Sequence, residues 1–369
     1  MELTGEQRAL RDAVRAMLAR YQRRAAAAGD GPRYDPALWQ RLCGEIGVAG
    51  LAVPEEYGGA AAGPVETHVV AEELGTRLTP SPLLGSAVLA TQALLASGDS
   101  AACQRLLPPV AAGTAVAALA WTPEAGHWDP GEVACQAVPP ASPGGGWALA
   151  GTAHHVLYGD CADVLLVAAR ARDGIGLFDV DPRQASVTRS AVTTMDLTSR
   201  LAIVQLDGAA GRRVGGRGGR AALTRARDLA CIALSAEQVG AAQRALELTV
   251  AYTKVRVQFG RAIGGFQAIQ HRLADLHVLV ESARSVSYAA AAAAAAGTPD
   301  PGLLAAAAKV YCSEAFARVA AEMIQLHGAL GITWEHDAHH FLKRAHAAAQ
   351  LFGQPAGHVA RIAAAVIGS

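Results

Sequence analysis

Two short segments combine polar side chains and glycines in a way that helix packing does not require. The first is Tyr252–Gln267 (YTKVRVQFGRAIGGFQ) and the second is Gln325–Arg344 (QLHGALGITWEHDAHHFLKR). Both interrupt apolar, alanine-rich sequence. Arginine presents a rigid fork of donors that suits a pyrophosphate, and glycine lets a ligand approach the backbone closely. The two segments therefore predict the docking site of an extended polar ligand.

The first segment is expected where a long helix ends. Gly260 is predicted to terminate that helix, with Arg256 in its last turn and Phe259 free to stack on a planar ring. The alternative is that Arg256 satisfies the carbonyls of the helix end while Phe259 belongs to the core. In the second segment Thr333 is predicted to cap the next helix, with Glu335 near its positive end.

Several other kinds of chemistry lack their motifs. His336, His339 and His340 have a spacing that can bring imidazoles to one helix face, but H-E-x-x-H and a nearby cysteine are absent, so no metal site is predicted. The chain has no G-x-S-x-G elbow and no G-x-x-x-x-G-K-[ST] loop. A serine hydrolase and a P-loop NTPase are therefore unsupported.

Composition describes a well-buried protein without a charged partner. Apolar residues make up 51% of the 369 residues, and Lys+Arg and Asp+Glu balance at 32 each, which argues against nucleic acid or a membrane surface as partner. The six scattered cysteines suit reduced thiols, and the N-terminal MELTGEQRALRD lacks an apolar signal core. The alanine-rich Tyr288–Gly297 is too short to span a bilayer. We expect a cytoplasmic protein.

The elements that must position the two segments follow an α, β, α order. The first third has helical spacing, with helices expected from Thr4 as cap and over 36–46, 66–74 and 86–96. Short apolar runs between Pro, Gly and Asp then predict strands at 116–121, 147–149, 164–168, 175–180 and 201–206. Four long helices are expected over 222–257, 265–296, 301–329 and 336–366.

The predicted fold class is thus α+β and mostly α. We expect an N-terminal helical domain (1–115), a small middle β-domain (116–210) and a C-terminal four-helix bundle domain (211–369). The segment Gly211–Arg220 (GRRVGGRGGR) can be interpreted as an RGG-like tail or as a dinucleotide loop. No βαβ unit surrounds it, so an interdomain linker is the preferred interpretation.

The sequence resembles the acyl-CoA dehydrogenase flavoprotein family over almost the whole chain. The resemblance is carried, in order, by four segments: Trp39–Gly59, Gly151–Asp163 (GTAHHVLYGDCAD), Tyr252–Asp275 with R-x-Q-F-G and F-Q, and Gln325–Arg344 with Q-x-x-G-x-x-G-x-T. Four matches in the right order, on the predicted elements, are more specific than any one alone.

The resemblance implies that the middle domain (116–210) is a β-barrel between the N-terminal helical domain and the C-terminal four-helix bundle. It implies FAD at a subunit interface of a homo-oligomer or heteromer. It also implies an acyl-CoA or other acyl thioester as substrate and electron-transfer flavoprotein as electron acceptor. By position it assigns FAD contacts to residues of the bundle and of the barrel. The bundle residues are Arg256, Gln258, Phe259, Ile263, Phe266, Gln267, Gln325 and Gly328, and the barrel residues beside the isoalloxazine ring are Thr122, Val156 and Leu157.

The family reaction needs a carboxylate that removes a proton from Cα of the thioester while the flavin takes a hydride from Cβ. The resemblance places this base at one of two positions, which in this chain hold Phe352 and Ala230. Substitute bases are Asp228, with an N-cap role as its alternative; Glu237, which can instead pair within the bundle; and Glu335, which can instead stabilise a helix start. Asp228 is the preferred catalytic candidate.

Three further accounts stay open on sequence alone. The chain can be one subunit of a heteromeric dehydrogenase, a flavoprotein recruited to another reaction, or a scaffold subunit that binds no flavin. The barrel also departs from the family pattern: Leu157 stands in place of the usual Thr, and His155 in place of the usual Trp.

Overall fold

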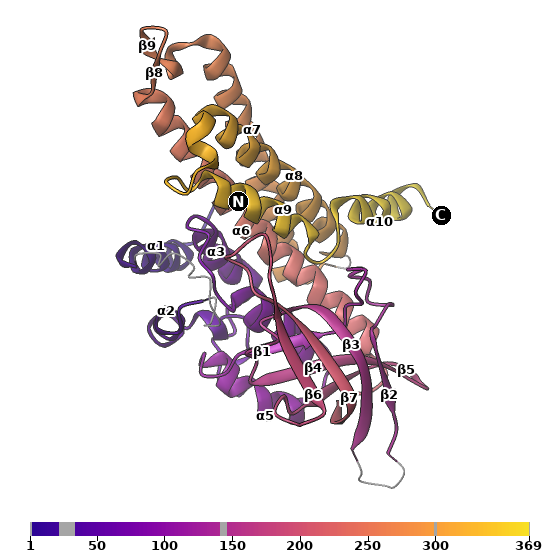
Figure 1. Ribbon diagram of the computed structural model, residues 1–369. Coiled ribbons are helices and arrows are strands. Elements are labelled where there is room, and N and C mark those ends of the chain that lie inside the picture. Colours follow the sequence, from indigo (N-terminus) through magenta and orange to yellow (C-terminus); the bar gives the residue numbers. More distant parts are fainter. Residues whose placement is uncertain (1, 22–33, 141–145, 299–300, 369) are drawn as a thin grey trace. The chain divides into compact units, whose positions relative to one another are not determined.

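The computed structural model describes residues 2–21, 34–140, 146–298 and 301–368 (Figure 1). Its elements follow the predicted order of helices, strands and helices. The chain forms two compact units: a bundle unit of residues 1–18, 68–79 and 231–369, and a barrel unit of residues 19–67 and 80–230. The mostly helical α+β class is confirmed, whereas the predicted boundaries at 116 and 211 stay predictions.

The first third contains short helices, several of them under-wound. Their bounds are α1 Gly5–Arg20, α2 Pro36–Arg41, α3 Pro64–Gly75, α4 Thr91–Ala96 and α5 Ser100–Ala111, with π-helical turns at Leu42–Ile46 and Leu83–Ala90 and 3₁₀ turns at Val48–Gly50 and Glu55–Tyr57. Thr4 caps α1 as expected, since its Oγ1 accepts from the Gln7 amide at 3.2 Å. Helix α5 was not predicted, because Pro108 and Pro109 near its end argue against a helix.

The strands of the barrel unit close into a ring, which confirms the barrel. They are β1 Ala117–Ala120, β2 Cys135–Val138, β3 Trp147–Leu157, β4 Val164–Ala171, β5 Gly174–Val180, β6 Val187–Val192 and β7 Leu201–Val214. Pairings β2–β3, β3–β7, β7–β5, β5–β4 and β4–β2 leave no gap, while β1 adds to β4 and β6 adds to β7. Strands β2 and β6 were not predicted: β2 has only four residues, and β6 has no buried residue and therefore no apolar run.

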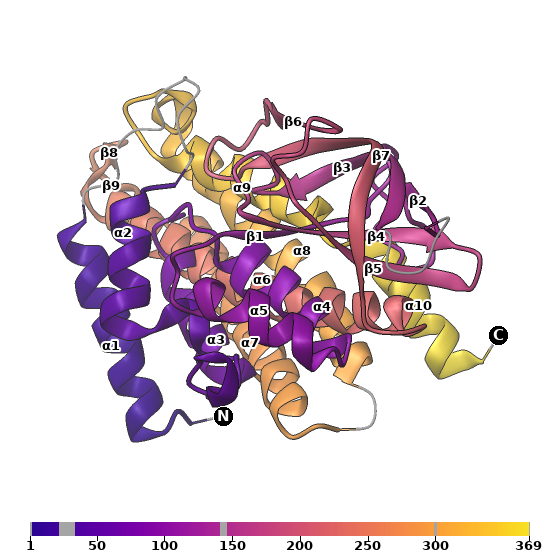
Figure 2. The same ribbon diagram turned by 90° about the horizontal axis from the view of Figure 1, so that it is seen from below.

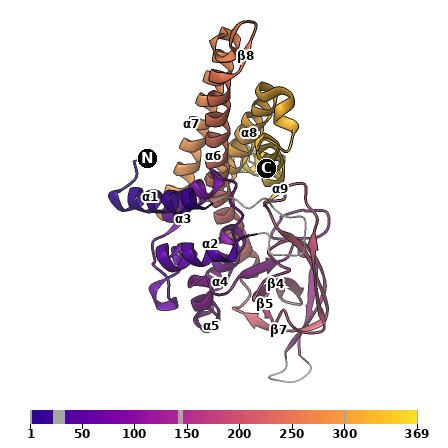
Figure 3. The ribbon, with the colours of Figure 1, turned by 60° about the vertical axis from the view of Figure 1, so that its left-hand side comes forward.

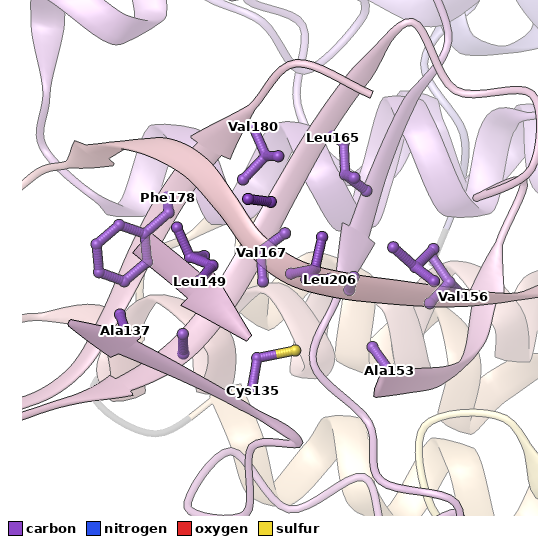
Figure 4. Close-up of a cluster of buried hydrophobic side chains, with 14 of the residues drawn as sticks. Cys135, Ala137, Leu149, Ala153, Val156, Leu165, Val167, Phe178, Val180 and Leu206 are labelled. Carbon is purple, nitrogen blue, oxygen red and sulfur yellow. The ribbon is translucent and has the colours of Figure 1, made fainter. Parts of the chain in front are cut away.

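Apolar side chains from the ring fill the barrel interior (Figure 4). Cys135, Leu149, Val167, Phe178 and Leu206 come from β2, β3, β4, β5 and β7 and are all buried. One predicted feature is wrong here: Gly211–Val214 is the last part of β7, paired with β5, so the segment taken as an interdomain linker begins as a strand. Only the few residues between Val214 and Gly219 are left as a linker.

In the bundle unit, four helices share one apolar core (Figures 1 and 2). They are α6 Gly219–Val255, of which the bundle unit contains the part from Cys231, α7 Gln267–Ala295, α8 Pro301–His327 and α9 Ala338–Gln350. The core residues Ala245, Val280, Phe316 and Ala345 come from these four helices. The predicted fourth helix over 336–366 is wrong in one respect, because a turn at 351–354 separates α9 from α10 (Pro355–Ile367).

Helix α3 crosses α6 within the bundle unit at very short range. A Cβ atom added to Gly75 would lie 2.1 Å from the Glu237 carbonyl oxygen, and one added to Gly240 would lie 1.9 Å from that of Glu72. Only glycine permits this backbone approach. The Glu72 carboxylate also accepts a hydrogen bond from Tyr288 Oη at 2.8 Å and pairs with Arg284 of α7.

Candidate functional site

A tight hairpin follows α6 and carries the first of the two polar segments. Strands β8 (Val257–Gln258) and β9 (Arg261–Ala262) pair at the shared end of α6 and α7 (Figure 3). Helix α6 already ends at Val255, so the prediction that Gly260 terminates it, with Arg256 in its last turn, is wrong. The reason is strand pairing: the Ile263 amide donates to the Arg256 carbonyl at 2.8 Å and continues the hairpin.

Phe259 occupies a strained position at the tip of this hairpin. Phe259 and Gly260 have φ of 55° and 78°, the left-handed conformations that a two-residue type I′ turn requires. A bulky residue is rare in that region, and Asn or Gly is the usual choice. The Phe259 ring is nevertheless 92% exposed and meets the Phe266 ring edge-on, with centroids 6.2 Å apart. A strained backbone under an exposed aromatic ring makes the hairpin tip a candidate ligand contact.

The polar side chains beside Phe259 also make few hydrogen bonds within the described residues. Arg256 and Gln258 are exposed. Gln258 Nε2 donates only to the neighbouring Val257 carbonyl, at 2.9 Å. Among the residues that the structure describes, the Arg256 guanidinium has no hydrogen bond or ion pair. The alternative in which Arg256 satisfies the carbonyls of α6 and Phe259 belongs to the core is therefore not what the chain adopts.

The other residues predicted in this segment lie beside the hairpin. Ile263 begins the 3₁₀ turn Ile263–Gly265, Phe266 precedes α7, and Gln267 is its exposed first residue. The Arg261 guanidinium lies 3.9 Å from the centroid of the half-buried Phe266 ring. Two arginines, one amide and an exposed aromatic ring are thus gathered within one short segment.

Stacked rings bring the second polar segment to the first. Tyr252 of α6 stacks on His327 of α8 with a centroid distance of 4.3 Å, and His327 in turn lies 4.3 Å from the His336 ring. His327 Nδ1 donates to the Met323 carbonyl at 2.7 Å, and burial lowers the pKa of this imidazole. A neutral ring leaves Nε2 as an acceptor, and no described residue donates to it.

The second segment is open to solvent at Gln325, Gly328 and Trp334, whereas its Gly331 and Phe341 are buried. Gln325 in the last turn of α8 is exposed, as is Gly328, which has φ of 60°. Trp334 is 75% exposed. The prediction that Thr333 caps the next helix is wrong: its Oγ1 donates back to the Leu330 carbonyl at 2.9 Å. The first amide of α9, that of Ala338, instead donates to His336 Nδ1 at 3.1 Å.

The barrel unit places its three predicted flavin contacts in one region. The His154 amide donates to the Thr122 carbonyl at 2.8 Å, next to a register shift in β3 that precedes Val156. Thr122, Val156 and Leu157 are all nearly inaccessible. Val156 points into the barrel core (Figure 4), which leaves its backbone rather than its side chain for a ligand. Their contact with a flavin ring stays a prediction.

A flavin dinucleotide fits the donor set of the bundle unit. The exposed guanidinium of Arg256 and the exposed amide of Gln258 suit a doubly charged pyrophosphate. The exposed Phe259 ring suits a planar group, and the positive-φ Gly328 allows close backbone approach. FAD is therefore compatible with these residues on chemical grounds.

The predicted substitute bases are mostly committed to other partners. Asp228 lies nine residues after the start of α6 at Gly219, so it does not cap that helix, and its carboxylate lies 3.2 Å from the Arg227 guanidinium. Glu237 is ion-paired with Arg344 within the bundle unit, as its alternative interpretation holds. Glu335 is exposed and precedes α9 without capping it.

The two positions at which the resemblance places a base are both apolar and closed. Ala230 and Phe352 are each 0% exposed. Phe352 has φ of 60°, and its carbonyl accepts from His358 Nε2 at 3.0 Å. Neither position offers a proton acceptor to a substrate, because a methyl group and a phenyl ring have none.

Metal binding and membrane insertion have no counterpart in the described ranges. There, no three or more His, Cys, Asp and Glu side chains are gathered as metal ligands. His339 and His340 instead pack against Trp334, with centroid distances of 4.7 and 5.9 Å. In the same ranges, every helix is too short or too polar to cross a bilayer.

Comparison with known proteins agrees with this fold. Residues 4–114 match the N-terminal domain of acyl-CoA dehydrogenases, and residues 216–367 match their C-terminal domain. The chain is 40% identical to acyl-CoA dehydrogenase IpdE2 of Mycolicibacterium smegmatis, over 90% of this chain and 89% of that protein. It is 32% identical to acyl-CoA dehydrogenase FadE27 of Mycobacterium tuberculosis, over 89% and 88% of the two chains. The chain belongs to the acyl-CoA dehydrogenase family, a family of flavoprotein oxidoreductases.

Two solved structures are similar over nearly their whole length. One is a variant of the Tcur3481-Tcur3483 steroid ACAD, with 31% identity, a TM-score of 0.88 and 98% of each chain covered. The other is the ChsE4-ChsE5 complex from Mycobacterium tuberculosis, with 30% identity, a TM-score of 0.88 and coverage of 100% of this chain and 99% of that one. Each of these structures is named for two different chains.

Sequence reasoning missed several residues that hold the site together. Tyr252 and His327 connect the two segments, and Lys309 and His358 flank the turn that contains Phe352. For Lys309 a signal was present: it is the first charged residue of its helix and directly follows the apolar Leu303–Ala308. A lysine in such surroundings is a candidate for burial, and buried lysines have partners.

Proposed function

We propose that this chain is an FAD-binding subunit of an acyl-CoA dehydrogenase that removes hydrogen from Cα and Cβ of an acyl thioester. The observation that carries the proposal is the hairpin tip, where a strained, exposed Phe259 stands beside the uncommitted Arg256 and Gln258. In this proposal Arg256 and Gln258 hold the pyrophosphate, and Phe259 covers a planar group. The chemistry that bound FAD supplies is acceptance of the hydride from Cβ.

A second proposal concerns the base that takes the Cα proton. It is favoured because the two positions where the family places a carboxylate hold Phe352 and Ala230, which are apolar and buried. We infer that a related second subunit supplies this base, in a heteromer like those for which the two similar solved structures are named. Asp228 remains the alternative within this chain. Its contact with Arg227 would have to break before it accepted a proton.

The substrate is proposed to be a bulky acyl thioester. The support is the similarity to an enzyme described as a steroid ACAD. Electron-transfer flavoprotein is the proposed acceptor of the electrons, on the strength of family membership alone. Two alternatives are that the chain is a flavoprotein recruited to another reaction or a scaffold without flavin. The experiment below distinguishes both from this proposal.

The test uses flavin absorbance. The purified chain is loaded with FAD and mixed without oxygen with CoA thioesters of straight-chain and polycyclic acids, alone and together with a related subunit that has the glutamate. We expect bound flavin in both samples and bleaching only in the mixture. Bleaching by the chain alone would contradict the second-subunit base. A protein that takes up no FAD, alone or in the mixture, would contradict the flavin-binding role.

Asp228 is tested in the same mixture. If the partner supplies the base, Asp228→Asn keeps the bleaching rate. If Asp228 is the base, the variant loses it while flavin uptake stays unchanged. The conservative amide keeps the size of the side chain, so the two outcomes are separated by charge alone.

A further inference from the structure

Helix α8 buries a lysine that the proposed reaction does not use. Lys309 is 0% exposed, and burial lowers its pKa to about 8. A buried ammonium normally has a carboxylate partner. In the described part of the chain Lys309 has none. Its Nζ instead donates to the carbonyls of Ala348 and Ala349, both at 2.9 Å, and to Ser313 Oγ at 3.1 Å.

The two carbonyls belong to the last turn of α9, which ends at Gln350. The end of a helix leaves carbonyls without amide partners and carries partial negative charge, so a cation is stabilised there. Lys309 thus places its ammonium group at the C-terminal end of α9. All three of its donors are accounted for by this contact, and the side chain has no freedom to serve another group.

The turn that follows is held from its other side by α10. Phe352 has a left-handed backbone with φ of 60°, which is unfavourable for a bulky residue. His358 of α10 donates from Nε2 to the Phe352 carbonyl at 3.0 Å. Gly353, with φ of 107°, allows this approach, because a Cβ there would lie 3.0 Å from the same nitrogen.

We propose that Lys309 and His358 are positioning residues that together fix where the side chain of residue 352 lies. Lys309 acts on the turn through α9 and His358 acts through the Phe352 carbonyl. The ring at 352 is thereby kept in one buried place despite the strained backbone. The inference rests on the proposed function in one respect, the role of position 352. The family reaction expects a base at this position, and in this chain Lys309 and His358 hold an apolar ring there.

A general stabilising role makes a different prediction from a positioning role. If Lys309 only stabilises the bundle, its removal lowers the unfolding temperature but leaves the Phe352 ring where it was in the folded protein. If Lys309 positions residue 352, its removal changes the surroundings of that ring even well below the unfolding temperature. A probe on the ring itself separates the two.

The experiment places 4-fluorophenylalanine at position 352 of the full chain and records ¹⁹F NMR spectra. One sharp resonance is expected for the otherwise unchanged protein. Lys309→Met and His358→Ala are each expected to shift or split it. His358→Gln keeps an N–H donor and is expected to restore the original resonance. Tyr311→Phe, a polar deletion on the same helix, is the matched control and is expected to leave it unchanged.

An unchanged resonance in folded Lys309→Met would overturn the assignment of Lys309. If that variant does not fold, the His358→Ala and His358→Gln pair decides: two identical spectra would overturn the proposal. The measurement requires neither flavin nor substrate. Failure of the proposed dehydrogenase function, read from flavin uptake and bleaching, is therefore distinguishable from failure of this inference.

Discussion

Replacing Phe259 by asparagine should stabilise the flavin-free protein and weaken flavin binding at the same time. A left-handed backbone costs a residue with a Cβ about 1 to 2 kcal/mol, and asparagine adopts it more readily. The ring is 92% exposed, so its loss removes little burial. We therefore expect a gain in the free energy of unfolding of about 1 kcal/mol. The lost ring contact should weaken FAD binding about tenfold, or by about 1.4 kcal/mol.

Two titrations measure these opposite effects. Urea unfolding of the FAD-free protein, at one fixed protein concentration, gives the change in stability. Quenching of flavin fluorescence gives the affinity for FAD. Val257→Thr is the control, because Val257 is 56% exposed on the adjacent strand and its backbone is not strained. A Phe259→Asn protein that is less stable than the parent, or that binds FAD equally well, would refute the link between strain and binding.

Further variants test the buried charges and the helix crossing. Glu237→Gln removes the carboxylate partner of Arg344 and should lower the free energy of unfolding in urea by about 3 kcal/mol, with no loss of flavin uptake; unchanged stability would show that the pair contributes nothing. Gly240→Ala should cost about 3 kcal/mol or more and reduce soluble yield, because its Cβ would lie 1.9 Å from the Glu72 carbonyl oxygen; a normal melting temperature would contradict this helix crossing. The pKa of Lys309 is lowered from 10.5 to about 8, so the unfolded chain binds more protons between these values and stability rises with pH there. Relative to Lys309→Met, which shares the neighbouring thiols of Cys231 and Cys312, the parent should gain about 2 kcal/mol between pH 8 and pH 10, and a flat difference would contradict the lowered pKa of Lys309.

Much of the fold was accessible from local sequence patterns. Apolar spacing located α1, α3 and the bundle helices, and the capping position of Thr4 was correct, because these features depend on neighbours a few residues apart. The break between α9 and α10 was missed although Pro355 marks it. Gly353, with φ of 107°, is a second local signal for this break. What the local pattern does not show is that Lys309, about forty residues earlier, takes the carbonyls of Ala348 and Ala349.

The candidate site shows the same division. The residue types around Arg256 and Phe259 were enough to predict a polar ligand there, but not the hairpin that presents them. A two-residue turn normally contains Asn-Gly, and Phe-Gly does not carry that signal. The pairing of Glu237 with Arg344 joins helices more than one hundred residues apart. Such contacts depend on tertiary packing, which periodicity in one sequence does not determine.

During synthesis, the barrel can close only after strand β7 has been made. Its fourteen residues pair with β3, with β6 and, at their far end, with β5. A nascent chain that has not yet released Val214 from the ribosome therefore carries three strands with an unpaired edge, and such edges promote association with other chains. At a synthesis rate of about 5 to 20 residues per second this exposure lasts for seconds. Slow codons or pauses before β7 should increase the demand for chaperones, whereas pauses after α6 has begun should not.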